Sequence, residues 1–294
     1  MSYRLLSFKT SEEHDVEQWN SRSLEGELES FKGRTLVRIF DRFLGGSKAR
    51  ILEGGCGFGA WCEWFQERGH ETIGIEYDEN IFARAKKFKP NVAVELGDIT
   101  KLNYPDNSFD AYISLGVIEH FEHGPEKAVQ ESFRVLKPGG LAFYTTPLLT
   151  SLRRLISHPV RNFYFLKRKL QGKQSYFWEY RFSKIELHKY LEEAGFEIIH
   201  TDVDDYETDV RDRHIGLWAD WFFLRKLDGE IWELNTAGKF ILRLLRVLPA
   251  WWYCSGLHLV ARASKSVPES SAAVKEPTGK TGETTQAHQV ENLL

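Results

Sequence analysis

Short apolar runs alternate with amphipathic stretches through the first half of the chain. The apolar runs predict strands, and apolar residues at helical spacing between them predict connecting helices. Strands that alternate with helices indicate an α/β fold, in which a mostly parallel sheet carries helices on both faces. The predicted strands lie at 51–53, 71–75, 92–95, 109–114 and 141–146.

Further elements follow this block. Ser183 and Glu186 match a capping box, which predicts the start of a helix that Gly195 ends. Apolar runs at 196–203 and 257–263 predict a sixth and a seventh strand.

Three glycines alternate after the first predicted strand, at Gly55, Gly57 and Gly59, and a helix follows at once. Glycine tolerates backbone angles that other residues avoid, so this loop can approach a ligand closely. The spacing also satisfies the dinucleotide fingerprint, with an acidic Glu76 downstream. Glu53 separates the two interpretations, because its carboxylate would repel a pyrophosphate and favour the ammonium and sulfonium charges of S-adenosylmethionine. The pattern therefore favours a methyl donor.

Carboxylates also follow the second and third strands. Glu76 can accept hydrogen bonds from both hydroxyls of a ribose, and Asp98 from an exocyclic adenine amine. Each has an alternative: Glu76 could cap the next helix, although Asp78 suits that role better, and a Gly-Asp pair is common in turns. We assign Glu76 to the ribose, at a surface-facing strand end, and expect its replacement by alanine to weaken cofactor binding with little loss of stability.

Five short motifs occur in order along the chain. They are Glu53-x-Gly55-x-Gly57-x-Gly59, Gly74-Ile75-Glu76, Gly97-Asp98-Ile99, Ile118-Glu119-His120-Phe121 and Arg134-Val135-Leu136-Lys137-Pro138-Gly139-Gly140. In this register they resemble the class I S-adenosylmethionine-dependent methyltransferases, and within them the type 11 branch, which includes ubiquinone- and menaquinone-biosynthesis enzymes. The resemblance implies a Rossmann-like seven-stranded sheet of order 3-2-1-4-5-7-6, with an antiparallel strand 7, helices on both faces and a cap insertion.

The resemblance also implies an S-adenosylmethionine site. Glu53 and the three glycines (Gly55, Gly57 and Gly59) would hold the methionine end of the cofactor, and Glu76 its ribose. The other implied contacts are Cys56 in the loop, Tyr77 after the second strand, Asp98 and Ile99 at the adenine, and Leu115 and Gly116 under the sulfonium. Arg22 or Arg34 could reach the cofactor carboxylate. Gly54 stands where the family usually has an apolar residue, which should make the turn more flexible.

His120 is the candidate general base. It follows the fourth strand, where cofactor and acceptor would meet, and an imidazole there could deprotonate an acceptor oxygen. The alternatives are that His120 walls the adenine site or bonds to the backbone. Weaker histidine candidates are His158, His188, His200 and His214.

Composition indicates one globular enzyme with additions. A chain of 294 residues can bury a large core, and its net charge of -3 gives no general pull toward nucleic acid, so no nucleic-acid partner is expected. The three cysteines have no paired or metal-type spacing, which indicates a reducing compartment. Without a signal peptide or a run of about 18 apolar residues, we expect a cytoplasmic protein, or one held peripherally at the inner face of a membrane.

Three regions are predicted along the chain. Residues 1–45 form a helical region over the cofactor mouth. Residues 46–263 form the methyltransferase domain, with a cap insertion at 148–182 and a second insertion at 204–253. Residues 264–294 are rich in polar residues and glycine, and predict a disordered tail.

The cap insertion carries the information on the acceptor. It interleaves aromatic and basic residues against a single acid, Glu179. This composition suits an anionic or amphiphilic acceptor, such as a phosphorylated glycan, a lipid-linked sugar or a quinone precursor at a membrane surface. The alternative is a solvated cap helix with lysine stems over an aromatic core. An amphipathic helix at 237–248 also allows peripheral membrane contact, although such a stripe more often packs in a core.

No metal ligand set is predicted. The acidic stretch 202–212 resembles one superficially, but it lacks the glycine and terminal glutamate of a calcium loop, so a solvated loop is expected.

The combined pattern predicts transfer of a methyl group to an oxygen of a small-molecule, lipid-linked or glycan acceptor. Transfer to nitrogen or carbon is the nearest variant. The alternatives from other classes are a nicotinamide-dependent oxidoreductase and a catalytically silent protein that binds S-adenosylmethionine.

Overall fold

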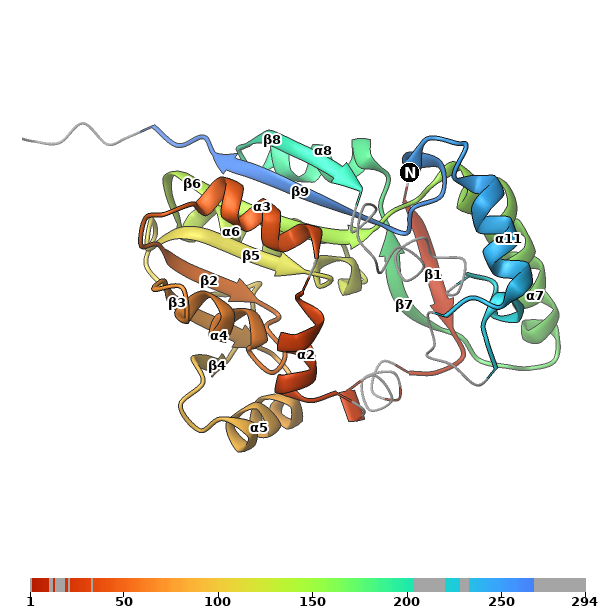
Figure 1. Cartoon of the computed structure of the whole chain (residues 1–294), viewed down its shortest axis with the longest axis horizontal. Helices are drawn as coiled ribbons and strands as arrows, with labels where there is room; N and C mark the ends of the chain where they lie inside the picture. Colours follow the sequence, from red (N-terminus) through yellow and green to blue (C-terminus); the bar gives the residue numbers. More distant parts are fainter. Residues whose placement is uncertain are drawn as a thin grey trace, which may run out of the picture.

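The computed structural model describes residues 2–10, 13, 19–20, 22–32, 34–203, 220–227 and 233–266. Its central feature is a seven-stranded sheet of β2 (Arg50–Gly54), β3 (Glu71–Glu76), β4 (Val94–Leu96), β5 (Phe109–Leu115), β6 (Leu136–Pro147), β8 (Phe196–Val203) and β9 (Gly256–Ala263). The order across the sheet is β4-β3-β2-β5-β6-β9-β8 (Figure 1). Neighbours pair in parallel except around β9, which is antiparallel to β6 and β8. The predicted order and the antiparallel seventh strand are therefore confirmed.

Helices cover both faces of this sheet, as predicted. The helices are α2 (Leu24–Ser30), α3 (Thr35–Leu44), α4 (Ala60–Gln66), α5 (Glu79–Phe88), α6 (Glu126–Val135), α7 (His158–Leu170), α8 (Lys184–Glu193) and α11 (Thr236–Leu245). On one face, the ring of Phe40 in α3 lies 5.2 Å from that of Phe143 in β6. On the other face, Val129 of α6 and Leu187 of α8 join the buried cluster around Tyr144. Within the described ranges, no helix has both the length and the apolar character needed to cross a bilayer.

Side-chain caps explain where two helices begin. Asp78 accepts hydrogen bonds from the backbone N–H groups of Asn80 and Ile81, at 2.8 and 2.9 Å, at the start of α5. Ser183 accepts from the N–H of Glu186 at 3.3 Å, at the start of α8. Both side chains satisfy N–H groups that the first turn of a helix leaves without partners.

The segment 137–140 departs from the prediction. We expected it to precede the fifth strand, but β6 already begins at Leu136. The pairing with β5 shifts from Phe109 opposite Leu136 to Ala111 opposite Leu141, so the extra residues of β6 bulge out of the ladder.

A separate two-stranded ribbon lies beyond the carboxyl ends of β5 and β6 (Figure 1). It pairs β1 (Tyr3–Ser7) with β7 (Tyr176–Arg181) in antiparallel fashion. The expected helical N-terminal region did not include β1, because the partner strand is distant in sequence. The domain limits themselves stay predictions. Parts of the second insertion, and the tail from residue 267 onward, lie outside the described residues.

Gly54 is the buried last residue of β2. A Cβ built there would clash with the hydroxyl of Tyr112, which is fully buried on β5, and would lie 3.0 Å from Cγ2 of Ile99. The absence of a side chain at Gly54 therefore makes room for the tyrosine in the core, while a more flexible turn stays a prediction.

Replacing Gly54 with alanine is expected to lower the free energy of unfolding by about 1–3 kcal/mol, the usual cost of an extra carbon in a packed core. Adding Tyr112→Phe should recover part of this loss, because it removes the nearest atom. Tyr112→Phe alone is the control, since its buried hydroxyl has no hydrogen-bond partner within the described structure. Urea unfolding of the three variants checks the prediction, and a fully stable Gly54→Ala variant would contradict it.

Candidate functional site

The loops after three adjacent strands meet at one edge of the large sheet. β2, β3 and β5 are parallel neighbours, so their carboxyl ends lie side by side. From β2 the chain continues outward to β3 and β4 on one side, and it then crosses to β5 on the other side of β2. Open α/β sheets bind ligands at such a switch point between neighbouring strands. This edge brings together the glycine loop after β2, Glu76 at the end of β3 and Leu115 at the end of β5.

Backbone hydrogen bonds hold the glycine loop against β3. The N–H groups of Gly55 and Cys56 both donate to the carbonyl of Ile75, at 2.8 and 3.1 Å. Gly55 and Gly57 have φ of +73° and +57°, a region that disfavours side chains. A Cβ at Gly57 would clash with the indole of Trp19, so this part of the N-terminal region lies directly on the loop.

Cys56 lies beneath the loop. It is buried, and its Sγ and that of Cys62 both lie against Gly74 of β3. Burial raises the pKa of the Cys56 thiol, which therefore stays protonated. This packing explains a small residue at position 56, while its contact with a cofactor stays a prediction.

Glu76 is tied to the loop. Its Oε2 accepts a hydrogen bond from the N–H of Gly57, and its Oε1 accepts one from the N–H of Asp78, both at 2.9 Å. The side chain is buried, so the expectation of a surface-facing position is wrong. Burial raises the pKa of Glu76, although the backbone donors act to lower it. A carboxylate in this place organises the loop as well as offering oxygens to a ligand.

The Glu76→Ala variant should therefore lose both cofactor affinity and stability. We expect S-adenosylmethionine to bind about 10-fold more weakly or worse, and the free energy of unfolding to fall by about 1–3 kcal/mol, because two backbone N–H groups lose their acceptor. Calorimetry and urea unfolding measure the two effects. Glu79→Ala is the matched control, since its carboxylate is exposed only three residues away. Unchanged affinity in Glu76→Ala would rule out the ribose role.

Glu53 makes the loop acidic. It is 5 % exposed, and the thiol of Cys62 donates to its Oε2 at 3.3 Å. Burial, then Cys62, and then the carboxylates of Glu27 and Glu76 raise the pKa of Glu53 well above its usual range. A positively charged group beside Glu53 would stabilise its ionised carboxylate and lower its pKa, whereas a pyrophosphate would add to the repulsion among the carboxylates.

The two N-terminal arginines both lie near the acidic loop. Arg22 Nη1 is 3.4 Å from Oε1 of Glu27, and Arg34 also acts electrostatically on that carboxylate. Burial nevertheless raises the pKa of Glu27. The geometry does not separate Arg22 from Arg34 as the partner of a cofactor carboxylate.

The residues predicted for the adenine and for the rim of the site are less enclosed. Tyr77 is 77 % exposed. Asp98 is exposed, and its Oδ1 accepts from both the N–H and the hydroxyl of Thr100 at 2.8 Å, which is the turn geometry considered as its alternative role. Ile99 is buried beside Gly54.

His120 is oriented by the ribbon. It follows β5, and its Nδ1 lies 2.9 Å from the carbonyl oxygen of Trp178 in β7. A carbonyl can only accept, so Nδ1 carries the proton, and Nε2 of the neutral ring keeps its lone pair. The backbone bond considered as an alternative thus exists, and it leaves Nε2 able to act as a base at the exposed end of the ring.

Glu119 is a site residue that sequence reasoning did not single out. Its side chain is 2 % exposed, and its Oε2 has no hydrogen-bond partner within the described structure. A Cβ at Gly116 would lie 3.6 Å from Oε1, so the carboxyl faces the end of β5. Burial, and to a lesser degree the charge of Glu179, raise the pKa of Glu119 well above its usual range. The signal in the sequence was an acid directly before His120 at a strand end.

Part of the basic cap is neutralised internally. Asp220 binds both Arg153, at 2.9 Å, and Arg181, at 2.6 Å, and all three side chains are buried. Arg181 also contacts Nε2 of His158 at 3.0 Å, and the His158 ring stacks on Tyr3 of β1. Burial lowers the pKa of His158 to about 3, and the charge of Arg181 adds to the effect. These ion pairs join the cap insertion to Asp220 of the second insertion, so neither arginine is free to bind an acceptor.

An open, mostly parallel sheet with a glycine loop at its switch point, and with carboxylates at two neighbouring strand ends, defines a Rossmann-like cofactor-binding domain. Residues 52–144 match the family described as a methyltransferase domain. Over this stretch the chain is therefore similar to methyltransferase domains, which agrees with the resemblance to the type 11 branch indicated by the five motifs.

Relatives and solved structures agree with this assignment. A probable S-adenosylmethionine-dependent methyltransferase of Mycolicibacterium smegmatis is 32% identical over 151 residues, which are 51% of this chain and 53% of that protein. A demethylmenaquinone methyltransferase of Paenarthrobacter aurescens is 32% identical over 110 residues, which are 36% and 43% of the two chains. A SAM dependent methyltransferase from Archaeoglobus fulgidus shares the fold, with a TM-score of 0.53 and 18% identity over 86% of this chain and 100% of that one. This chain spans about half the length of the curated relatives it matches.

Proposed function

We propose that this protein transfers a methyl group from S-adenosylmethionine to an oxygen of its acceptor. The acidic surroundings of the glycine loop are the observation that carries the proposal. The pKa of Glu53 is raised by burial and, to a lesser degree, by the carboxylates of Glu27 and Glu76, and no lysine or arginine forms an ion pair with Glu53 within the described residues. This environment suits a ligand with an ammonium group and disfavours a dinucleotide.

The proposed roles follow the geometry of the strand ends. Glu53 would pair with the ammonium group, and Gly55 and Gly57 let the backbone approach the methionine end closely. Glu76 would bind the ribose, and Leu115 with Gly116 would lie beneath the sulfonium. The same proposal assigns Cys56 and Gly59 to the loop contacts, and Tyr77, Asp98 and Ile99 to the ribose and adenine side.

When bound, S-adenosylmethionine supplies an already activated methyl group, so alignment provides much of the rate. His120 then takes up the proton that the acceptor hydroxyl releases, at its Nε2, while Trp178 holds the opposite nitrogen. Burial raises the pKa of Glu119 well above its usual range, and the protonated carboxyl can donate a hydrogen bond to a group bound beside Gly116.

The acceptor is proposed to be amphiphilic and to be met at an anionic membrane surface. The supporting feature is the outer face of α7 with the turn before it. Seven apolar side chains there are exposed and span about half of the helix circumference: Leu155, Ile156, Val160, Phe163, Tyr164, Leu166 and Leu170.

The charge of the same segment indicates the kind of surface. Residues 151–171 contain no acid, and Arg154, Lys167 and Lys169 are exposed around the apolar face. An exposed apolar helix face with basic residues and no acids fits an anionic lipid interface.

Vesicle binding tests this surface. We expect the protein to cosediment with vesicles that contain phosphatidylserine and not with pure phosphatidylcholine vesicles. The pair Phe163→Ser and Leu170→Ser should reduce binding at least 10-fold, while Leu227→Ser, which changes a 98 % exposed leucine elsewhere, should not. Concentration-dependent dimerisation without vesicle binding would show instead that a second copy covers α7.

Two measurements test the catalytic proposal. Calorimetry with S-adenosylmethionine and with NAD should detect binding of the first only, and the reverse result would overturn the proposal in favour of an oxidoreductase. Incubation with S-adenosylmethionine and a lipid extract should release S-adenosylhomocysteine together with a methylated lipid. Cofactor binding without turnover on lipid or aqueous extracts would favour a catalytically silent protein.

A further inference from the structure

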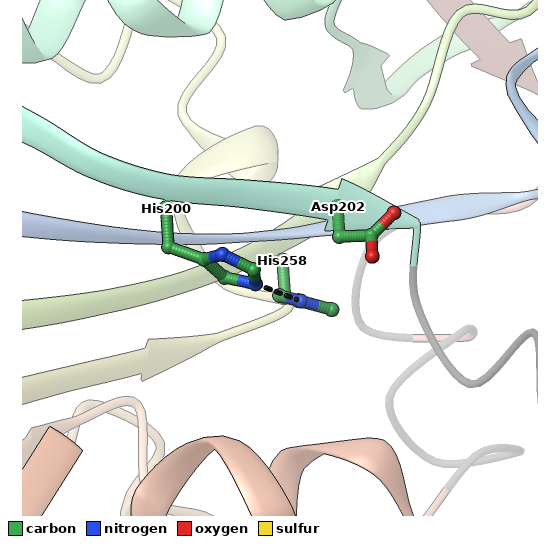
Figure 2. A group of neighbouring side chains, drawn as sticks. All are labelled: His200, Asp202 and His258. Atoms are coloured by element: carbon green, nitrogen blue, oxygen red, sulfur yellow. Dashed lines mark hydrogen bonds between the residues drawn. The ribbon is translucent and has the colours of Figure 1, made fainter. Parts of the chain in front are cut away.

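Two histidines and an aspartate converge near the edge of the large sheet (Figure 2). His200 and Asp202 are alternate residues of β8, and His258 of β9 stands opposite Asp202 in the ladder. One ligand atom from each side chain lies within 4.8 Å of the other two. Figure 2 shows the imidazoles facing each other through Nε2 atoms, which are 3.2 Å apart. The ring of Phe43 in α3 lies 5.7 Å from that of His200, so α3 covers this face.

We propose that His200, Asp202 and His258 bind a divalent transition-metal ion. Two nitrogens bound tetrahedrally to one zinc ion, with Zn–N bonds of about 2.0–2.1 Å, lie roughly 3.3 Å apart. The observed separation of 3.2 Å matches this geometry. Two imidazoles and a carboxylate select Zn²⁺ and its neighbours over Mg²⁺ or Ca²⁺, which prefer oxygen ligands.

The local charges are compatible with an ion. Arg42 and Asp202 both act electrostatically on His200, with opposite signs of charge. Asp202 supplies a negative charge that opposes Arg42. One carboxylate oxygen accepts from the N–H of Val203 at 2.8 Å, and the other has lone pairs for an ion.

A direct hydrogen bond between two neutral rings is the competing explanation for the short distance. That arrangement would need only the histidines, because a carboxylate takes no part in an N–H···N bond. The requirement for Asp202 therefore separates the two explanations.

The position of the site indicates what the ion would do. Leu115, Thr145, His258 and Asp202 stand opposite one another in successive strands. With strands about 4.8 Å apart, His258 lies on the order of 10 Å from Leu115. Three protein ligands from two strands would tie the edge strand β8 to β9 and leave a coordination position open on the exposed side of Asp202.

The test uses the full chain without an affinity tag, after removal of metals with EDTA. Zn²⁺ alone is titrated by calorimetry. Co²⁺ is titrated in a separate experiment and followed by visible absorption, because the spectrum of bound Co²⁺ distinguishes nitrogen and oxygen ligands from thiolates. We expect one ion per chain and an increase in melting temperature. His200→Gln and Asp202→Asn should each weaken Zn²⁺ binding at least 10-fold. His188→Gln is the matched control, because this histidine binds the hydroxyl of Thr201 at 2.9 Å, next to the proposed site.

Three results would overturn the proposed metal site. A wild-type chain that binds no stoichiometric Zn²⁺ would overturn the proposal, as would equal loss of binding in the control. Normal binding in Asp202→Asn with loss in His200→Gln would also overturn the three-ligand site. Melting curves without metal establish that each variant is folded. No cofactor or acceptor is present, so the result is independent of the proposed methyl transfer.

Discussion

Replacing His120 with alanine is expected to lower kcat for methyl transfer by about 100-fold or more, the usual contribution of a general base. The ring is exposed, and it contacts Trp178 through the Nδ1 hydrogen bond and a T-shaped ring contact at 5.0 Å, so the change removes the aligned Nε2 with little effect on the core. The dissociation constant of S-adenosylmethionine should not change, because other residues are proposed to bind it. Release of S-adenosylhomocysteine measures kcat, and calorimetry measures cofactor affinity.

The matched control is His123→Ala, which removes an exposed imidazole three residues away and should retain full turnover. Weaker cofactor binding in His120→Ala with unchanged kcat would contradict the base role. It would show instead that the ring forms a wall of the adenine site.

The Asp220→Asn substitution is expected to lower the free energy of unfolding by about 3–5 kcal/mol, because two buried guanidinium groups lose their shared counter-charge. Arg153 and Arg181 both bind this carboxylate within 2.9 Å. Urea unfolding near pH 7 measures the loss. Asp106→Asn is the control, since that carboxylate is 69% exposed in its pair with Arg134 and should change stability by less than about 1 kcal/mol.

The effect should also depend on pH in a defined direction. Burial acts to raise the pKa of Asp220, but Arg153 and Arg181 more than offset it, so the folded pKa lies well below the unfolded value. The stabilisation is then fully present above about pH 4 and is lost as the pH falls through the folded pKa. The difference between parent and variant should shrink in acid, and a constant difference would contradict the assignment of Asp220 as the buried anion.

Local patterns predicted most of the fold because each one reports on its own segment. Apolar runs marked the strands, and the glycines after β2 marked the loop. Ser183 marked the start of α8. The order of the sheet came from the resemblance carried by these motifs, and the strand pairing confirms it. The roles of Glu53, Glu76 and His120 stay predictions that the variants above test.

Contacts between distant segments could not be predicted in the same way. The sequence around Gly54 does not show that a side chain there would clash with Tyr112. The sequence around β1 does not indicate that β7 is its partner strand. Burial also changed the interpretation of charged residues. Arg153 and Arg181 looked like part of a basic surface, but they are enclosed with Asp220.

By itself, the sequence determined the class of fold, the place of the glycine loop and the residues at the strand ends, since these depend on spacing within single elements. Only the tertiary structure decided which side chains are desolvated and which meet across strands. It enclosed Glu119 beside Gly116, turned Nδ1 of His120 toward Trp178, and brought His200 to His258 across 58 residues. Such pairings depend on how remote strands align, because only the folded sheet sets the distance between them.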